Sequence, residues 1–167
     1  MHAGDSDEIG LTRRHEAHEP ALSLPGSSVE ELSAIVVDAA FHLHRDLGPG
    51  LLESVYEALL TKILRDHGLA VARQMSVPIS FAGVAVDEGF RADLVIQDRL
   101  LVELKSVEAL APVHHKQVLT YLRLMHLPLG LLINFGSATF HDGVKRIING
   151  NHYLGPSRLR INQAKPD

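Results

Sequence analysis

Three residues with side chains suited to phosphate or metal chemistry lie close together in the middle of the sequence. Glu103 and Lys105 stand in one apolar run, 100–105, and Asp93 stands ten residues before Glu103 in another. Two carboxylates on neighbouring strands form a divalent-cation site, and an amine beside them can activate water or hold a phosphate. The pattern predicts such a site. The alternative for Glu103 and Lys105 alone is an exposed strand face, where opposite charges contribute little.

Whether the two acids meet depends on the register of the strands predicted over 90–96 and 100–105. Successive side chains of a strand point to opposite faces, so a slip of one residue would separate Asp93 from Glu103. An odd loop, such as 97–99, pairs Ile96 with Leu100 and puts the acids side by side. A two-residue turn would put them on opposite faces. The site hypothesis therefore includes a prediction of register.

Two helices are predicted ahead of these strands. Residues 28–31 have the pattern of a capping box, and the helix that they open should end at the breaker 48–50. The second helix is predicted from about 51 to 67, with Gly68 as its C-terminal stop. Its expected inward-facing residues are Val55, Leu59 and Ile63.

From residue 69 onward the hydrophobic period changes to two, which indicates strands. Short strands are predicted near 70–75, 77–81 and 84–87, with a turn at 82–83. In the strand over 90–96 the apolar residues expected to share one face, opposite Asp93, are Ala92, Leu94 and Ile96.

A third helix and two further strands complete the predicted domain. Pro112 can begin the helix, which should run to about His126. The apolar run 129–135 is typical of a strand buried on both faces, and 145–149 can add an edge strand. This order of helices and strands indicates an α/β layered fold.

The composition limits the function classes. The 167 residues suit one domain, and the absence of cysteine excludes disulfides and thiolate chemistry. The formal charge of -4 counts against tight, non-specific binding of nucleic acid. The absence of cysteine also fits a cytoplasmic protein, and no apolar stretch is long enough to span a membrane. We expect a disordered leader (1–26), a single domain (27–155) and a polar C-terminal tail (156–167).

Four short motifs follow one another between residues 50 and 121. They are Gly50-Leu51-Leu52-Glu53-Ser54-Val55-Tyr56, Phe90-Arg91-Ala92-Asp93-Leu94, Val102-Glu103-Leu104-Lys105 and Gln117-Val118-Leu119-Thr120-Tyr121. In this order and spacing the chain resembles the GxxExxY protein family from about residue 32 to residue 150. That family looks like a branch of the PD-(D/E)XK nuclease superfamily, closest in motif style to its RecB-like exonucleases.

The resemblance implies a PD-(D/E)XK restriction-endonuclease-like core, with a central mixed β-sheet flanked by helices. It also implies a Mg²⁺ or Mn²⁺ site with Asp93, Glu103 and Glu53 as ligands, completed by the backbone carbonyl of Leu104. One residue departs from the superfamily pattern: the proline that precedes the first Asp is Ala92 here. That proline is not a ligand.

The same resemblance assigns roles to residues beside the metal. Lys105 would sit next to the attacking water, and Gln117 and Tyr121 would orient Lys105 or contact the nucleic-acid backbone. His114 lies three residues before Gln117 and can line the cleft, although a solvated His is the simpler interpretation. Simpler interpretations also exist elsewhere: Glu53 as a first-turn acid that complements the helix dipole, and both Tyr56 and Tyr121 as packing residues.

The leading expectation is a metal-dependent nuclease that hydrolyses phosphodiester bonds by metal-activated water, with DNA favoured over RNA as substrate. The alternative is a catalytically inactive binding or accessory module with the nuclease fold, working in a larger complex. A protein partner or a homo-oligomer is compatible with both. The sequence does not separate DNA from RNA, because phosphate chemistry is common to both.

Overall fold

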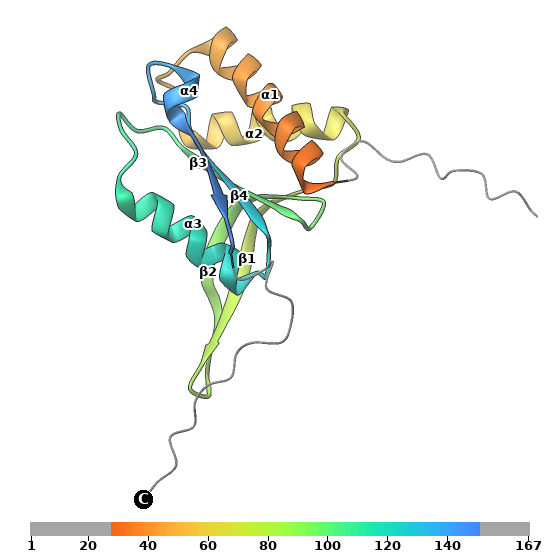
Figure 1. Ribbon diagram of the computed structural model, residues 1–167, viewed down its shortest axis with the longest axis vertical. Coiled ribbons are helices and arrows are strands. Elements are labelled where there is room, and N and C mark those ends of the chain that lie inside the picture. Colours follow the sequence, from red (N-terminus) through yellow and green to blue (C-terminus); the bar gives the residue numbers. More distant parts are fainter. Residues whose placement is uncertain (1–27, 151–167) are drawn as a thin grey trace, which may run out of the picture.

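The computed structural model describes residues 28–150, and its centre is a five-stranded mixed sheet with helices on both faces (Figure 1). The strands are β1 (Val71–Phe81), β2 (Val84–Ile96), β3 (Leu100–Lys105), β4 (Leu129–Asn134) and β5 (Val144–Ile148), in that order across the sheet. Neighbouring strands are antiparallel except β3 and β4, which are parallel. The predicted fold class is confirmed. The predicted leader (1–26) and tail (156–167) lie outside the described residues.

The helices begin and end close to where their local signals predict. They are α1 (Val29–Leu47), α2 (Glu53–Asp66), α3 (Pro112–Leu124) and the short α4 (Phe140–Gly143), which was not predicted. Ser28 and Glu31 form the predicted capping box: each side chain accepts a hydrogen bond from the other residue's backbone N–H, both at 3.1 Å. Gly68 follows α2 with φ +81°, a conformation that glycine adopts without strain.

The prediction for the buried face of α2 is wrong. Tyr56, Leu60 and Leu64 are fully buried, whereas the side chains of Val55 and Leu59 are more than a third exposed. Both sets have helical spacing and lie one residue apart, so periodicity alone does not choose between them. The choice depends on contacts with the rest of the fold, including the hydroxyl partners that Tyr56 finds only when it points inward.

The sheet separates two hydrophobic cores. The larger one lies between α1, α2 and one face of the sheet, and the smaller one lies under α3 on the other face. Gly130 of β4 allows this second layer to pack closely, because a Cβ there would lie 2.8 Å from the Val118 side chain of α3. Strand β4 is buried along its whole length, as the sequence predicts, and β5 forms an edge of the sheet.

The predicted alternation along β2 fails at one point. Leu94 and Ile96 lie in the larger core as expected, but Ala92 lies in the smaller core with Val95. The pairing with β1 passes from Arg73↔Leu94 to Met75↔Ala92. Between them Gln74 has φ +48°, outside the extended region. The alternation along β2 shifts by one residue at this point, so the prediction for Ala92 is wrong.

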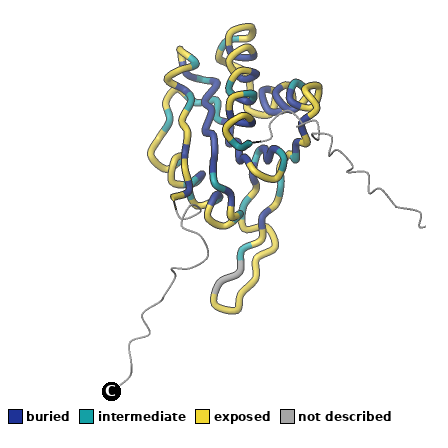
Figure 2. The backbone as a smooth tube through the Cα atoms, turned by 45° about the vertical axis from the view of Figure 1, so that its right-hand side comes forward, coloured by how far each residue is buried: buried dark blue, intermediate teal, exposed yellow. Residues whose placement is uncertain are grey.

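Strands β1 and β2 continue beyond the cores as a two-stranded ribbon (Figures 1 and 2). The predicted turn at Ala82 and Gly83 is present, with φ values of +49° and +80°. The strands predicted separately over 84–87 and 90–96 are one continuous strand, β2. Figure 2 shows that most of the ribbon is exposed. Within residues 28–150, no helix is long and apolar enough to cross a membrane.

Candidate active site

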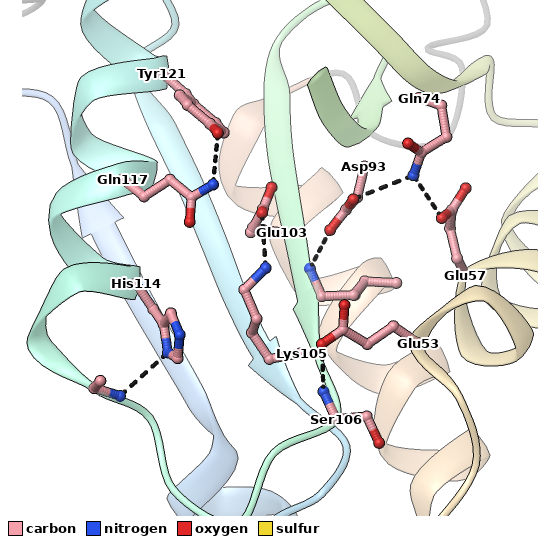
Figure 3. Close-up of polar contacts among 12 residues, drawn as sticks. Glu53, Glu57, Gln74, Asp93, Glu103, Lys105, Ser106, His114, Gln117 and Tyr121 are labelled. Carbon is pink, nitrogen blue, oxygen red and sulfur yellow. Dashed lines mark hydrogen bonds and ion pairs between the residues drawn. The ribbon is translucent and has the colours of Figure 1, made fainter. Parts of the chain in front are cut away.

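The β2–β3 hairpin has the register that brings the two acids together. Ile96 pairs with Leu100 across an odd loop, as predicted, and regular pairing runs as far as Leu94↔Val102. Beyond this pair the contact with β3 is made by the Asp93 side chain. Its Oδ2 accepts a hydrogen bond of 2.9 Å from the Leu104 backbone N–H. The carboxylate of Asp93 is thereby held against β3, close to Glu103 in space although ten residues before it in the sequence (Figure 3).

Glu103 and Lys105 form a buried pair on one face of β3. Lys105 Nζ donates to Glu103 Oε1 at 2.9 Å, and the two side chains are 15% and 3% exposed. The interpretation of these residues as an exposed strand face is therefore wrong. Glu103 Oε2 is buried without a hydrogen-bond partner. A buried carboxylate oxygen left unpaired is costly, so its retention needs an explanation.

The environment of this pair disfavours an ionised Glu103 in the metal-free protein. Burial, followed by the nearby charge of Asp93, raises the pKa of Glu103 to about 7. Burial also raises the pKa of Asp93, although the hydrogen bond from Leu104 opposes the rise. Burial alone would lower the pKa of Lys105, but the Glu103 charge outweighs it and raises that pKa. Two carboxylates whose negative charges repel each other create a place where a cation is stabilised.

The Gly-x-x-Glu-x-x-Tyr motif ties the start of α2 to the end of β3. Gly50 has φ +115° in the loop before the helix. Glu53 is exposed, and its Oε1 accepts a hydrogen bond of 3.0 Å from the backbone N–H of Ser106. The fully buried Tyr56 donates through its hydroxyl to the Gly48 carbonyl at 2.5 Å and stacks on Phe135. Tyr56 is thus a packing residue, and Glu53 lies near enough to Lys105 to influence its pKa.

The three residues predicted on α3 point toward β3 (Figure 3). Gln117 Nε2 donates to the Tyr121 hydroxyl at 2.5 Å, which confirms that the two share a face. Tyr121 also stacks on Phe90 of β2. His114 is partly buried, and its Nδ1 accepts a hydrogen bond from the Ala111 backbone N–H at 3.1 Å, which caps the start of α3.

A second acid of α2, absent from the sequence prediction, lies behind Asp93. Glu57 is buried and accepts hydrogen bonds from Arg73 at 2.9 Å and from Gln74 at 2.7 Å. Gln74 also donates to Asp93 Oδ1 at 3.2 Å. The available sequence signal was that Glu57 stands four residues after Glu53, on the same side of the helix. Nothing in the local pattern marks Gln74.

Asn134 is a further residue that the sequence did not indicate. It is fully buried at the end of β4, opposite Lys105 in the parallel ladder. Its side chain bonds both the N–H and the C=O of Val107, at 3.0 and 2.8 Å. Gly136 then passes so close to Val107 that a Cβ would clash with its backbone. These contacts hold the chain in place where it leaves the Lys105 strand.

The donor set suits a hard divalent cation in part. Asp93 and Glu103 provide carboxylate oxygens, the ligands that Mg²⁺ and Mn²⁺ prefer, and Glu103 Oε2 has no other partner. Across residues 28–150, however, no three His, Cys, Asp or Glu side chains are grouped closely enough to hold a metal. Glu53 is instead bonded to Ser106. The three-carboxylate ligand set stays a prediction.

Comparison with known protein families agrees with this fold. The sequence profile of the PD-(D/E)XK nuclease superfamily matches residues 30–147. The chain therefore belongs to the PD-(D/E)XK nuclease superfamily. Nucleases of this superfamily generally use divalent metal ions, and membership suggests a nucleic-acid substrate. No curated protein and no solved structure was found to match the chain.

Proposed function

We propose that this protein is a Mg²⁺- or Mn²⁺-dependent nuclease that hydrolyses phosphodiester bonds in DNA. The observation that carries the proposal is the buried Glu103 carboxylate, which has one oxygen on Lys105 and one without a partner, beside Asp93. A merely structural ion pair would not need the second oxygen unpaired. The order of the four motifs further supports assignment to the GxxExxY branch of the superfamily.

In this proposal Asp93 and Glu103 hold the metal together with the backbone carbonyl of Leu104. The Leu104 N–H already donates to Asp93, so this peptide lies next to the ligands. Glu53, at the start of α2, is the third carboxylate of the set. When bound, the cation supplies Lewis-acid polarisation of a phosphoryl oxygen and makes water more acidic.

The side chains around the metal would orient the phosphate and stabilise its charge. The raised pKa of Lys105 keeps its amine protonated at neutral pH, so Lys105 contributes positive charge to the transition state. Gln117 and Tyr121 face this amine from α3, and His114 lies one turn earlier on the same side (Figure 3). We assign these three to positioning the nucleic-acid backbone.

The test is cleavage of labelled single- and double-stranded DNA and RNA by the purified protein, with Mn²⁺, Mg²⁺ or EDTA. We expect metal-dependent cleavage of DNA that falls by about 100-fold or more in Lys105→Ala, because the transition state loses a fixed charge. Lys116→Ala is the matched control, since Lys116 is an exposed lysine of α3. Unchanged cleavage in Lys105→Ala or Glu103→Ala would rule out this active site.

A second candidate function is a non-catalytic binding or accessory module with the same fold. The observation in its favour is an apolar stripe exposed on α2 and the loop before it, formed by Leu51, Leu52, Val55 and Leu59. Patches of this kind often mark contact sites for other proteins. The two functions separate by calorimetry: absence of Mn²⁺ binding at millimolar concentration, together with no cleavage, would favour the accessory module.

A further inference from the structure

Gln74 lies between two carboxylates that come from different elements. Its Nε2 donates to Glu57 Oε2 of α2 at 2.7 Å and to Asp93 Oδ1 of β2 at 3.2 Å. An amide nitrogen carries two hydrogens, so it can serve both acceptors at once. Gln74 is therefore the bridge that connects Asp93 to the buried acid of α2 (Figure 3).

We propose that Gln74 is a positioning residue for the metal site, which fixes the orientation of the Asp93 carboxylate through the Glu57 anchor. The inference rests on the proposed function, because it treats Asp93 as a metal ligand. Asp93 is held at both oxygens: Oδ2 by the Leu104 N–H and Oδ1 by Gln74. Two donors at opposite ends of a carboxylate determine its plane, while lone pairs remain for a cation.

The charges of the neighbouring groups support this positioning role of Gln74. Arg73 is the cation in this network, and it pairs with Glu57 at 2.9 Å. The two groups that bond Asp93, an amide and a backbone N–H, are both neutral. Neutral donors orient a carboxylate without cancelling its negative charge, so Asp93 keeps its attraction for a metal. A guanidinium in the place of Gln74 would compete with the cation.

The backbone at Gln74 gives independent support. Its φ of +48° is in the left-handed region, which residues other than glycine seldom adopt. This conformation is also the point at which the alternation of β1 and β2 shifts. Strained backbone of this kind concentrates at functional sites, where the surrounding structure maintains it. Here it presents the side chain to both acids at once.

The experiment measures Mn²⁺ affinity by calorimetry in Gln74→Ala and Gln74→Asn. Asn tolerates left-handed φ but is one methylene shorter, so this variant preserves the backbone and removes the bridge. We expect both variants to bind Mn²⁺ about 10-fold or more weakly, the range found when the supporting partner of a ligand is removed. Cleavage should recover toward the wild-type rate as Mn²⁺ is raised, because the loss is in metal affinity.

Gln97→Ala is the matched control. Gln97 is also a glutamine with left-handed backbone, φ +51°, but it lies in the loop between β2 and β3. The Gln97→Ala variant should bind Mn²⁺ with the same affinity as the wild type. Unchanged Mn²⁺ affinity in both Gln74 variants, each shown to be folded by its unfolding transition, would overturn the inference. So would equal losses in the Gln97 variant, which would indicate a general effect on the hairpin.

The outcome also separates this inference from the proposed function. Wild-type protein that binds Mn²⁺ but cleaves no nucleic acid, with weakened binding in the Gln74 variants, would support the positioning role and contradict the nuclease. Cleavage by the wild type with unchanged metal affinity and metal dependence in the variants would contradict the positioning role alone. Wild-type protein that binds no Mn²⁺ would contradict both.

Discussion

Glu103 is the residue whose chemistry depends most on its surroundings. In a solvated strand it would be an ordinary acid, but here it is buried beside Asp93, with Oε1 bonded to Lys105 and Oε2 without a hydrogen-bond partner. Such an arrangement destabilises the ionised form in the metal-free protein. Functional sites commonly keep side chains that lower the stability of the fold.

This environment predicts how the stability of the metal-free protein varies with pH. The pKa of Glu103 is about 7 in the folded state against 4.5 without perturbation, so the folded state binds the proton more tightly. The stabilisation is complete below pH 4.5 and is lost as the pH rises through about 7. We expect a loss on the order of 3 kcal/mol, measured as the difference in unfolding free energy between wild type and Glu103→Gln.

Denaturant unfolding in EDTA from pH 4 to pH 9 measures this difference. The variant serves as the control for histidines and other groups that titrate in the same range, since both proteins contain them. Addition of Mn²⁺ should restore stability to the wild type at high pH, with a smaller effect in Glu103→Gln. A difference that is independent of pH would show that Glu103 ionises normally.

At the scale of elements, α2 is held at its first turns by the motif Gly-x-x-Glu-x-x-Tyr. Tyr56 contributes the buried part of this attachment: its hydroxyl donates to the Gly48 carbonyl and accepts from the Leu51 N–H. In the same loop the Leu51 carbonyl accepts a hydrogen bond from the Ser106 hydroxyl. The start of α2 and the end of β3 are therefore connected at two points, Leu51 and Glu53.

Tyr56→Phe should lower the unfolding free energy by about 1–3 kcal/mol, because two backbone groups lose a buried partner while the ring stacking is kept. Thermal or denaturant unfolding measures the change. Tyr121→Phe is the comparison: Tyr121 is only partly buried, and its partner Gln117 can turn toward water, so we expect a smaller loss. Equal losses in the two variants would contradict the anchoring role of the Tyr56 hydroxyl.

At the scale of the whole molecule, the two hydrophobic cores and the candidate site are independent of the two-stranded ribbon that β1 and β2 form beyond them. Neither hydrophobic core includes a residue between Met75 and Phe90. Val77 pairs with Phe90, and past this pair the register shifts. The exposed Val84 and Val86 lie beyond it. The stability of the domain should therefore come almost entirely from the part inside this pair.

We expect replacement of residues 78–89 by Asn-Gly to leave a cooperative unfolding transition and a free energy within about 1 kcal/mol of the wild type. Asn-Gly is the preferred two-residue turn for closing a hairpin, and it would join Val77 directly to Phe90. Calorimetric unfolding and Mn²⁺ binding are the measurements. Loss of cooperative folding, or weaker Mn²⁺ binding, would show that the ribbon supports the core or the site.

Much of this protein could be predicted from local sequence. The capping box at Ser28, the left-handed Gly68 and the buried run of β4 depend on contacts within a few residues, and all three are confirmed. The register that pairs Ile96 with Leu100 was one of two alternatives, selected by the requirement that Asp93 and Glu103 share a site, and it is confirmed as well. These features need only short-range chemistry and alternation.

Tertiary structure decided the rest. Which of two apolar stripes of α2 is buried depended on partners for Tyr56 that lie in the loop before the helix and directly after β4. Ala92 lies in the smaller core because the alternation of β2 shifts opposite Gln74 of the neighbouring strand, whose backbone is not extended. The network from Glu57 through Gln74 to Asp93 joins α2, β1 and β2. Sequence periodicity describes one element at a time, whereas these outcomes were set by contacts between elements far apart in the chain.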